Sequence, residues 1–151
     1  MTISIQPLPH SEADTLKPMI EELADFHNTL NEQFSTFYPV IEINETMKQI
    51  KKALEENELF ILGAYQDKEL LGFIELTFSE NAAKINRLFV NSLYRNHHIG
   101  KQLMNQALNF LKTKSIDSVD LTVVQENLQA KKFYENFAFE ERAVIMTKKL
   151  K

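Results

Sequence analysis

Between residues 88 and 103 the chain reads Leu88-Phe89-Val90-Asn91-Ser92-Leu93-Tyr94-Arg95-Asn96-His97-His98-Ile99-Gly100-Lys101-Gln102-Leu103. The first three residues are typical of the end of a strand, and Ile99 begins an amphipathic stretch, so a short turn should join a strand to a helix. Helix N-termini present unpaired N–H groups and partial positive charge, and Arg95 and Lys101 add cations, so this turn can bind phosphate. These residues alone also fit an ordinary strand-to-helix turn.

The helix that follows is the most strongly patterned segment of the chain. From Ile99 to about Lys114 apolar residues recur at helical spacing on one broad face. Gly100, near its start, has no Cβ and lets the backbone come close to a ligand. The apolar face consists of Ile99, Leu103, Met104, Ala107, Leu108 and Leu111.

Shorter periodic segments predict the rest of the fold. The segment 31–43 has no clear period and predicts a loop or a broken helix that can fold over a binding site. The order of elements predicts one α/β domain over residues 1–151 with a mixed sheet. We expect strands over 3–5, 59–65, 70–78, 84–90, 119–124 and 143–147, and helices over 14–30, 46–56, 99–114 and 128–136.

Composition excludes several classes of protein. Of the 151 residues, 44% are hydrophobic and 25% are charged, as in a folded globular protein and unlike a disordered or fibrous chain. The net charge of −4 argues against a general binder of nucleic acid or anionic membranes. Residues 1–14 lack the basic start and apolar run of a secretory signal, and no stretch approaches a membrane span. We therefore expect a soluble, cytoplasmic protein.

Metal and thiol chemistry are not expected. The sequence contains no cysteine, which excludes disulfides, thiolate metal sites and cysteine nucleophiles. His97 and His98 are adjacent and would point in different directions, and no acidic residue accompanies them at helical spacing. The histidines therefore do not form a ligand set.

A second patterned run lies downstream and reads Val123-x-x-x-Asn127-x-x-Ala130-x-x-Phe133-Tyr134-Glu135-Asn136-Phe137-Ala138-Phe139. It is similar to motif B of the GCN5-related N-acetyltransferases (the GNAT family), and the run 88–103 resembles their motif A, Tyr-Arg-Gly-x-Gly-Ile-Gly after an apolar strand. Residues 71–74 also look like the third strand of that family. The resemblance covers essentially the whole chain and implies a mostly antiparallel central sheet with helices on both faces.

The resemblance also implies a site for acetyl-coenzyme A as acyl donor. In the family, the main chain of the strand end pairs with the pantetheine arm, and the following turn wraps the pyrophosphate. The counterpart of Asn127 contacts pantetheine or helps to hold two strands apart. The cofactor-binding residues so implied are Leu88, Phe89, Val90, Arg95, Asn96, His97, His98, Ile99, Gly100, Lys101 and Asn127.

Two residues are catalytic candidates. Tyr134 matches the tyrosine that family members place near the thioester sulfur, where a phenol can protonate the leaving thiolate. The alternative is a packed tyrosine whose hydroxyl is satisfied structurally. Family members often carry a glutamate base on the strand before motif A, where this sequence has Lys84 and Asn86. Glu75 or a water chain would then have to act as the general base. Glu75 fits equally well as a solvent-exposed strand residue without a catalytic role.

Two departures from the family pattern, whose core reads Arg/Gln-x-x-Gly-x-Gly/Ala from Arg95 onward, bear on cofactor binding and on the end of the last helix. His98 replaces the first motif glycine, so that either the turn shifts and the imidazole donates to phosphate, or cofactor affinity falls. A surface-loop histidine without a cofactor role is the third reading. Ala138 replaces the glycine before Phe139.

The predicted function is transfer of an acetyl group from acetyl-coenzyme A to a primary amine of a small molecule, peptide or protein, by direct attack in a ternary complex. The alternative is a catalytically weak or inactive acyl-coenzyme A-binding module, which His98 and the missing strand carboxylate favour. Acidic residues such as Glu32, Glu42 and Glu45 can attract a cationic amine. The acceptor and the oligomeric state, a homodimer included, stay open.

Overall fold

The structure is a computed structural model that describes residues 2–30 and 42–151. Five strands form one sheet in the order of the sequence: β1 (Ser4–Pro7), β2 (Phe60–Gln66), β3 (Glu69–Ser79), β4 (Ala82–Val90) and β5 (Ser118–Asp120). The first four pair antiparallel, while β4 and β5 pair parallel. The predicted mixed, mostly antiparallel sheet and the hairpin of β2 and β3 are therefore confirmed.

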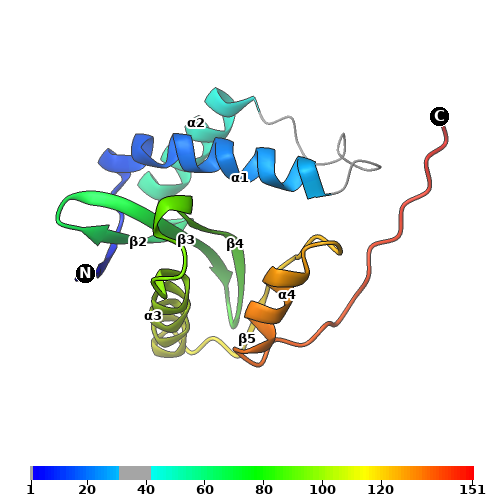
Figure 1. Cartoon of the computed structure of the whole chain (residues 1–151). Coiled ribbons are helices and arrows are strands. Elements are labelled where there is room, and N and C mark those ends of the chain that lie inside the picture. The colour runs from blue at the N-terminus through cyan, green and yellow to red at the C-terminus, as the bar shows by residue number, and fades with distance from the viewer. Residues whose placement is uncertain (1, 31–41) are drawn as a thin grey trace.

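Helices cover both faces of the sheet, as expected (Figure 1). On one face lie α1 (Lys17–Leu30) and α2 (Ile43–Glu55), and on the other lies α3 (Ile99–Thr113). The last helix, α4 (Leu128–Glu135), follows β5. A 3-10 helix over His10–Leu16 leads into α1, so that Pro18 falls in the first turn of the α-helix, where its missing N–H costs nothing.

The core consists of two apolar layers that share the central strands. Because successive side chains of a strand point to opposite faces, Phe73 packs toward α1 and α2, while Ile74 packs toward α3. Both side chains are fully buried. This double coverage explains why β3 reads as a continuous apolar run rather than an alternating one.

Several boundaries differ from the sequence-based expectation. The helix predicted over 46–56 begins at Ile43, because the carboxylate of Glu42 accepts hydrogen bonds from the N–H groups of Asn44 (3.2 Å) and Glu45 (2.9 Å). The first strand reaches Pro7, two residues beyond its expected end. Apart from residues 42 and 43, the predicted loop over 31–43 lies outside the described residues.

The prediction for the end of the sheet is wrong. No strand forms over 143–147, and Val144, Ile145 and Met146 are 76%, 82% and 91% exposed. Figure 1 shows this segment running away from the sheet. β-branched residues favour a strand only when a neighbouring strand and a packing surface are available. Residues 143–147 have neither of these.

Gly72 sets how closely β3 and β4 approach. A Cβ added there would lie 2.6 Å from the carbonyl oxygen of Phe89 and 3.2 Å from the Cα of Val90. Both neighbours are backbone atoms of β4, so they can move away only if the strand itself moves. The glycine therefore fixes the position of the strand end that precedes the 91–98 turn.

We predict that Gly72→Ala lowers the free energy of unfolding by about 1–3 kcal/mol, because overpacking against backbone forces the strands apart. The matched control is Gly100→Ala, where the new Cβ would lie 3.6 Å from the ring of Phe133, an ordinary contact. That helical position should gain up to about 1 kcal/mol. Urea unfolding of both variants tests this, and equal midpoints would contradict the steric argument.

Candidate active site

A hollow lies where β4 and β5 separate. The two strands pair only from Ala82 with Ser118 to Lys84 with Asp120. The sequence predicted a strand over 119–124, but β5 ends at Asp120 and residues 121–124 leave the sheet. The resulting hollow is lined by Ile20, Leu23, Ala24, Ile85, Asn86, Arg87, Leu88, Leu121, Thr122, Val123, Val124, Asn127, Ala130 and Tyr134.

A bulge in β4 accompanies the separation. Glu75 of β3 pairs with Arg87, whereas the next residue, Leu76, pairs with Ile85, so that Asn86 is the extra residue on β4. A bulge bends its strand and increases the local twist. The bulge thus gives a physical reason for β4 to leave β5 just after Lys84.

Beyond the bulge, no strand of the described residues pairs with the edge of β4 that faces away from β3. The N–H of Asn91 donates to the carbonyl of Leu71 (2.8 Å), and the carbonyl of Phe89 faces Gly72, so both groups point toward β3. Backbone direction alternates along an antiparallel strand, which turns the groups of Leu88 and Val90 toward the gap. Consistently, the Nε of Arg95 donates to the carbonyl of Val90 (3.3 Å). Of the three predicted strand residues, Leu88 and Val90 therefore turn their main chain toward the gap, and Leu88 also lines the hollow.

The turn before α3 contains two left-handed residues. Asn96 has φ 70° and His98, the N-cap of α3, has φ 61°. Both residues stand where the family pattern has glycine, so the backbone keeps the glycine-like conformation without glycine. The side chain of His98 makes no capping hydrogen bond, and the first bond of the helix runs from the N–H of Gln102 to the carbonyl of His98 (3.0 Å). The N–H groups of residues 99–101 consequently have no partner within the helix.

Asn127 and Tyr134 are both carried by α4. The side-chain oxygen of Asn127 caps this helix by accepting from the N–H of Ala130 (3.1 Å). Tyr134 lines the hollow, with its ring packed edge-on against Phe133 (5.4 Å between centroids) and Phe139 (5.8 Å). Within the described residues its hydroxyl makes no hydrogen bond. Burial raises the pKa of the phenol above its ordinary value of 10.0, so Tyr134 is protonated at neutral pH.

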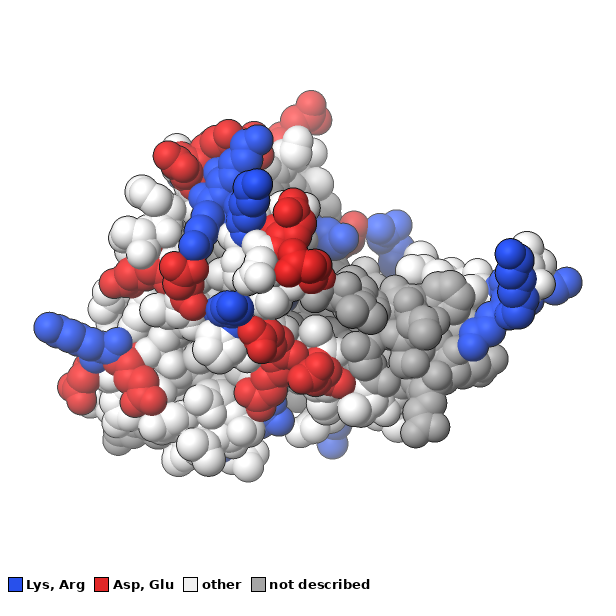
Figure 2. Space-filling model, turned by 90° about the horizontal axis from the view of Figure 1, so that it is seen from above, with Lys and Arg blue, Asp and Glu red and all other residues white. Residues whose placement is uncertain are grey.

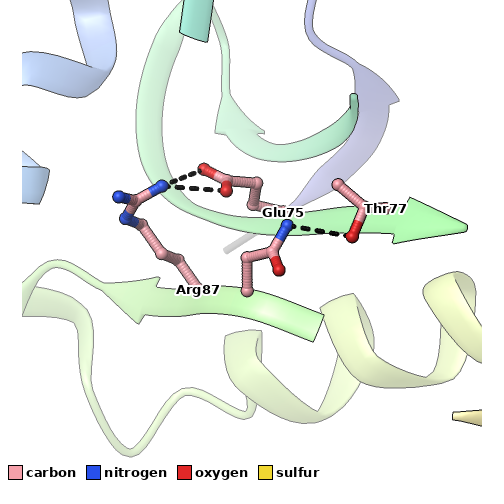
Figure 3. A network of polar contacts seen from close by, with 4 residues as sticks. Glu75, Thr77 and Arg87 are labelled. Carbon is pink, nitrogen blue, oxygen red and sulfur yellow. Dashed lines mark hydrogen bonds and ion pairs between the residues drawn. The ribbon is translucent and has the colours of Figure 1, made fainter. Parts of the chain in front are cut away.

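Glu75 is not a solvated strand residue, because only 3% of it is exposed. Figure 3 shows its carboxylate facing the guanidinium of Arg87, whose Nη1 lies 2.8 Å from each carboxylate oxygen. Beside this pair, Asn86 donates to the hydroxyl of Thr77 (3.3 Å). Glu75, Arg87 and Asn86 line a second, polar hollow together with Lys84, Ile85 and Thr122.

Sequence reasoning missed Arg87. It lies on β4, whose other charged residue is Lys84, and Glu75 lies among apolar residues on β3. Opposite charges on consecutive strands indicate a cross-strand ion pair. The bulge at Asn86 shifts the register, so counting residues outward from the β3–β4 turn would not have placed Arg87 opposite Glu75. No group of three or more residues that could hold a metal ion is found in the described part of the chain. Residues 2–30 and 42–151 also contain no helix long and apolar enough to span a membrane.

The sequence matches the model of the Acetyltransferase (GNAT) family over residues 23–139, which is more than half of the chain. The chain belongs to the GNAT family. A relative, the spermidine N(1)-acetyltransferase of Thermoplasma acidophilum, is 32% identical over 93 residues, which are 62% of this chain and 58% of the relative. This chain thus matches less than two thirds of the length of that GNAT protein.

Solved structures agree with this assignment. The PaiA N-acetyltransferase of Thermoplasma acidophilum, in complex with coenzyme A, is 26% identical with a TM-score of 0.66, covering 91% of this chain and 89% of that protein. A tetramutant of the protein BH1408 from Bacillus halodurans has a TM-score of 0.85 at 14% identity, covering 97% of this chain and 99% of that one. The latter likeness is one of fold.

We predict that His98→Gly raises the free energy of unfolding by about 0.5–1 kcal/mol, because a left-handed conformation costs an L-residue about 1–2 kcal/mol while glycine loses more backbone entropy. His97 provides the matched control, since it is an adjacent, exposed histidine whose φ is not positive. His97→Gly should lower the same free energy. Denaturant titration of both variants measures the difference, and the same sign in both would contradict the prediction.

Proposed function

We propose that the protein is an N-acetyltransferase that transfers an acetyl group from acetyl-coenzyme A to a primary amine by direct attack in a ternary complex. The observation that carries the proposal is the gap between β4 and β5, which has the free backbone edge of β4 on one side and Tyr134 on the other. Membership of the GNAT family supports it, as does the relative solved with coenzyme A.

The residues of the gap fit the cosubstrate. We propose that the backbone groups of Leu88 and the N–H of Val90 pair with the amide groups of pantetheine, as a further strand would, while the Val90 carbonyl accepts from Arg95. The unpartnered N–H groups at the start of α3, with Arg95 and Lys101 beside them, suit a pyrophosphate. In this proposal the binding site also includes the residues that form the end of β4 and the following turn: Phe89, Asn96, His97, His98, Ile99 and Gly100. Asn127, the N-cap of α4, holds that helix next to the gap.

The proposed reaction assigns the protein two direct roles, stabilising the oxyanion and protonating the leaving thiolate. A neutral amine attacks the thioester carbonyl, and a backbone N–H of β4 facing the gap stabilises the negative charge that develops on the carbonyl oxygen. As the carbon–sulfur bond breaks, Tyr134 donates its proton to the sulfur of the leaving thiolate, and the proton that the nitrogen loses passes through water back to the phenolate. Positioning the two reactants in one gap supplies much of the rate. Glu75 as general base stays a prediction, and its two oxygens already accept from Arg87, so taking up a proton must disrupt that contact.

The acceptor enters, in this proposal, from the side of α1, which contributes Ile20, Leu23 and Ala24 to the hollow. Figure 2 shows the helical layer of α1 and α2 from above, with Asp and Glu side chains gathered on it among several Lys and Arg. Glu21, Glu22 and Asp25 of α1 are exposed. Such carboxylates attract a cationic amine. A relative that is a spermidine acetyltransferase supports a small-molecule amine as acceptor.

A second candidate is a module that binds acyl-coenzyme A without efficient catalysis. The tight bonding of Glu75 to Arg87 favours it, because no other described carboxylate lines either hollow. Calorimetric titration with acetyl-coenzyme A, followed by thiol release with a panel of amines, separates the two. An enzyme gives both binding and thiol release, whereas the module gives binding alone.

We predict that Tyr134→Phe lowers kcat about 100-fold, the usual contribution of a general acid, and leaves the Kd for coenzyme A unchanged. Because burial raises the pKa of Tyr134 above 10.0, ionisation of the phenol should cause no loss of rate as the pH rises from 7 to that value. Thiol-release kinetics across this range test both statements.

Tyr65→Phe is the control for that experiment. Tyr65 lies on β2, outside the hollow, and its hydroxyl donates to Glu12 (3.4 Å). Removal of this hydroxyl in Tyr65→Phe should leave kcat unchanged. Equal turnover by the two variants would rule out the proton-donor role of Tyr134 while leaving the cosubstrate assignment intact.

A further inference from the structure

Arg87 is held in one orientation by Glu75. The Nη1 atom donates to both carboxylate oxygens at 2.8 Å, and the side chains are 24% exposed for Arg87 and 4% exposed for Glu75. Charge-assisted hydrogen bonds of this length are among the stronger polar contacts in proteins. The guanidinium is therefore fixed before any substrate binds.

This pairing leaves one edge of the guanidinium unused. Nε and Nη2 make no hydrogen bond within the described residues, and in Figure 3 they point away from Glu75. Arg87 lines both hollows, the one between β4 and β5 and the polar one next to it. The Nε–Nη2 edge presents parallel donors whose spacing matches the two oxygens of a carboxylate.

The charge around Arg87 also suits an anion. The polar hollow contains Glu75, Arg87 and Lys84 as its charged residues, so two cations share it with one anion. Lys84 makes no ion pair within the described part of the chain. A bound carboxylate would balance the remaining positive charge, whereas a second cation would not.

We propose that Arg87 is a specificity-determining residue that binds a carboxylate of the substrate pair beside the reacting centre, with Glu75 as the residue that positions it. This inference rests on the proposed function, and it deepens that function by naming the chemical class of the substrate. The carboxylate has two possible carriers: the amine acceptor, as in an amino acid, or the acyl group of the donor, as in succinyl-coenzyme A.

Matched substrates distinguish the two carriers. The first comparison uses ω-amino acids of increasing chain length and their primary amides, with acetyl-coenzyme A as donor. The second uses succinyl-coenzyme A against acetyl-coenzyme A, with the amides as acceptors. We expect a preference of about 10- to 100-fold in kcat/KM for the carboxylate in one comparison, the value of a hydrogen bond to a charged group.

Variants of the pair test the assignment to Arg87. Arg87→Lys keeps a cation next to Glu75 but lacks the two parallel donors of the Nε–Nη2 edge. It should therefore lose the preference for the carboxylate and turn over acids and amides alike. Glu75→Gln should raise KM for the preferred acid more than for its amide, whereas loss of a general base would lower kcat for the acid and the amide alike. Should either single variant fail to fold, the double variant Glu75→Gln/Arg87→Gln leaves no unpaired charge and should also lose the preference.

Arg142→Gln is the matched control, because it removes one arginine that pairs with Asp120 on an exposed surface. It should keep the wild-type preference. If the wild-type protein treats acids and amides alike in both comparisons, or if the preference survives in Arg87→Lys, the inference is overturned.

A binding experiment separates this inference from the proposed function. N-acetyl derivatives of the same amino acids and of their amides are titrated into the protein with coenzyme A present, which requires no turnover. With succinyl-coenzyme A, the corresponding titration compares its Kd with that of acetyl-coenzyme A. A preference for the carboxylate that needs Arg87 supports the inference even if no amine is acetylated, and its absence in both titrations overturns it even in an active enzyme.

Discussion

The separation of β4 from β5 after Lys84 and Asp120 is the constraint on which the rest of the molecule depends. Parallel pairing brings the two strands together for three residues, and the bulge at Asn86 then turns β4 away. A sheet that stayed paired to Val90 would hide the backbone of Leu88 and Val90 and place β5 where Tyr134 now faces a hollow. The cost of the separation is a stretch of unpaired backbone, which a bound molecule or water must satisfy.

The same bulge also determines where the charged side chains of β3 and β4 lie. By shifting the register it sets Arg87 opposite Glu75, so that a buried carboxylate receives its partner where the hollow begins. A buried ion pair is weak evidence for stability, because desolvation offsets much of the attraction. Its physical role here is geometric, since it holds a planar group still at the edge of a cavity. Gly72 has a comparable role on the backbone, where a Cβ would push β4 out of place.

Local signals in the sequence predicted most of the fold, and the failures have a common cause. The helix of 99–113 and the strands of 60–90 follow from periodicity, because each buries a regular apolar face. The left-handed conformation of His98 was not predicted, because histidine itself disfavours that conformation. The early end of β5, the unpaired tail and the partner of Glu75 depend on which strands meet and in what register. Such long-range facts leave no trace in the spacing of neighbouring residues.

The tail that leaves the sheet has a consequence for the behaviour of the protein in concentrated solution. Val144, Ile145 and Met146 are exposed, and β5 forms the edge of the described sheet, so contact between molecules through these apolar side chains is sterically open. Lys148, Lys149 and Lys151 follow directly and give each tail the same sign of charge. Like charges flanking an apolar run act as gatekeepers against aggregation. Their repulsion weakens once salt shortens the screening length to roughly 8 Å or less, so colloidal stability should be greatest in dilute buffer.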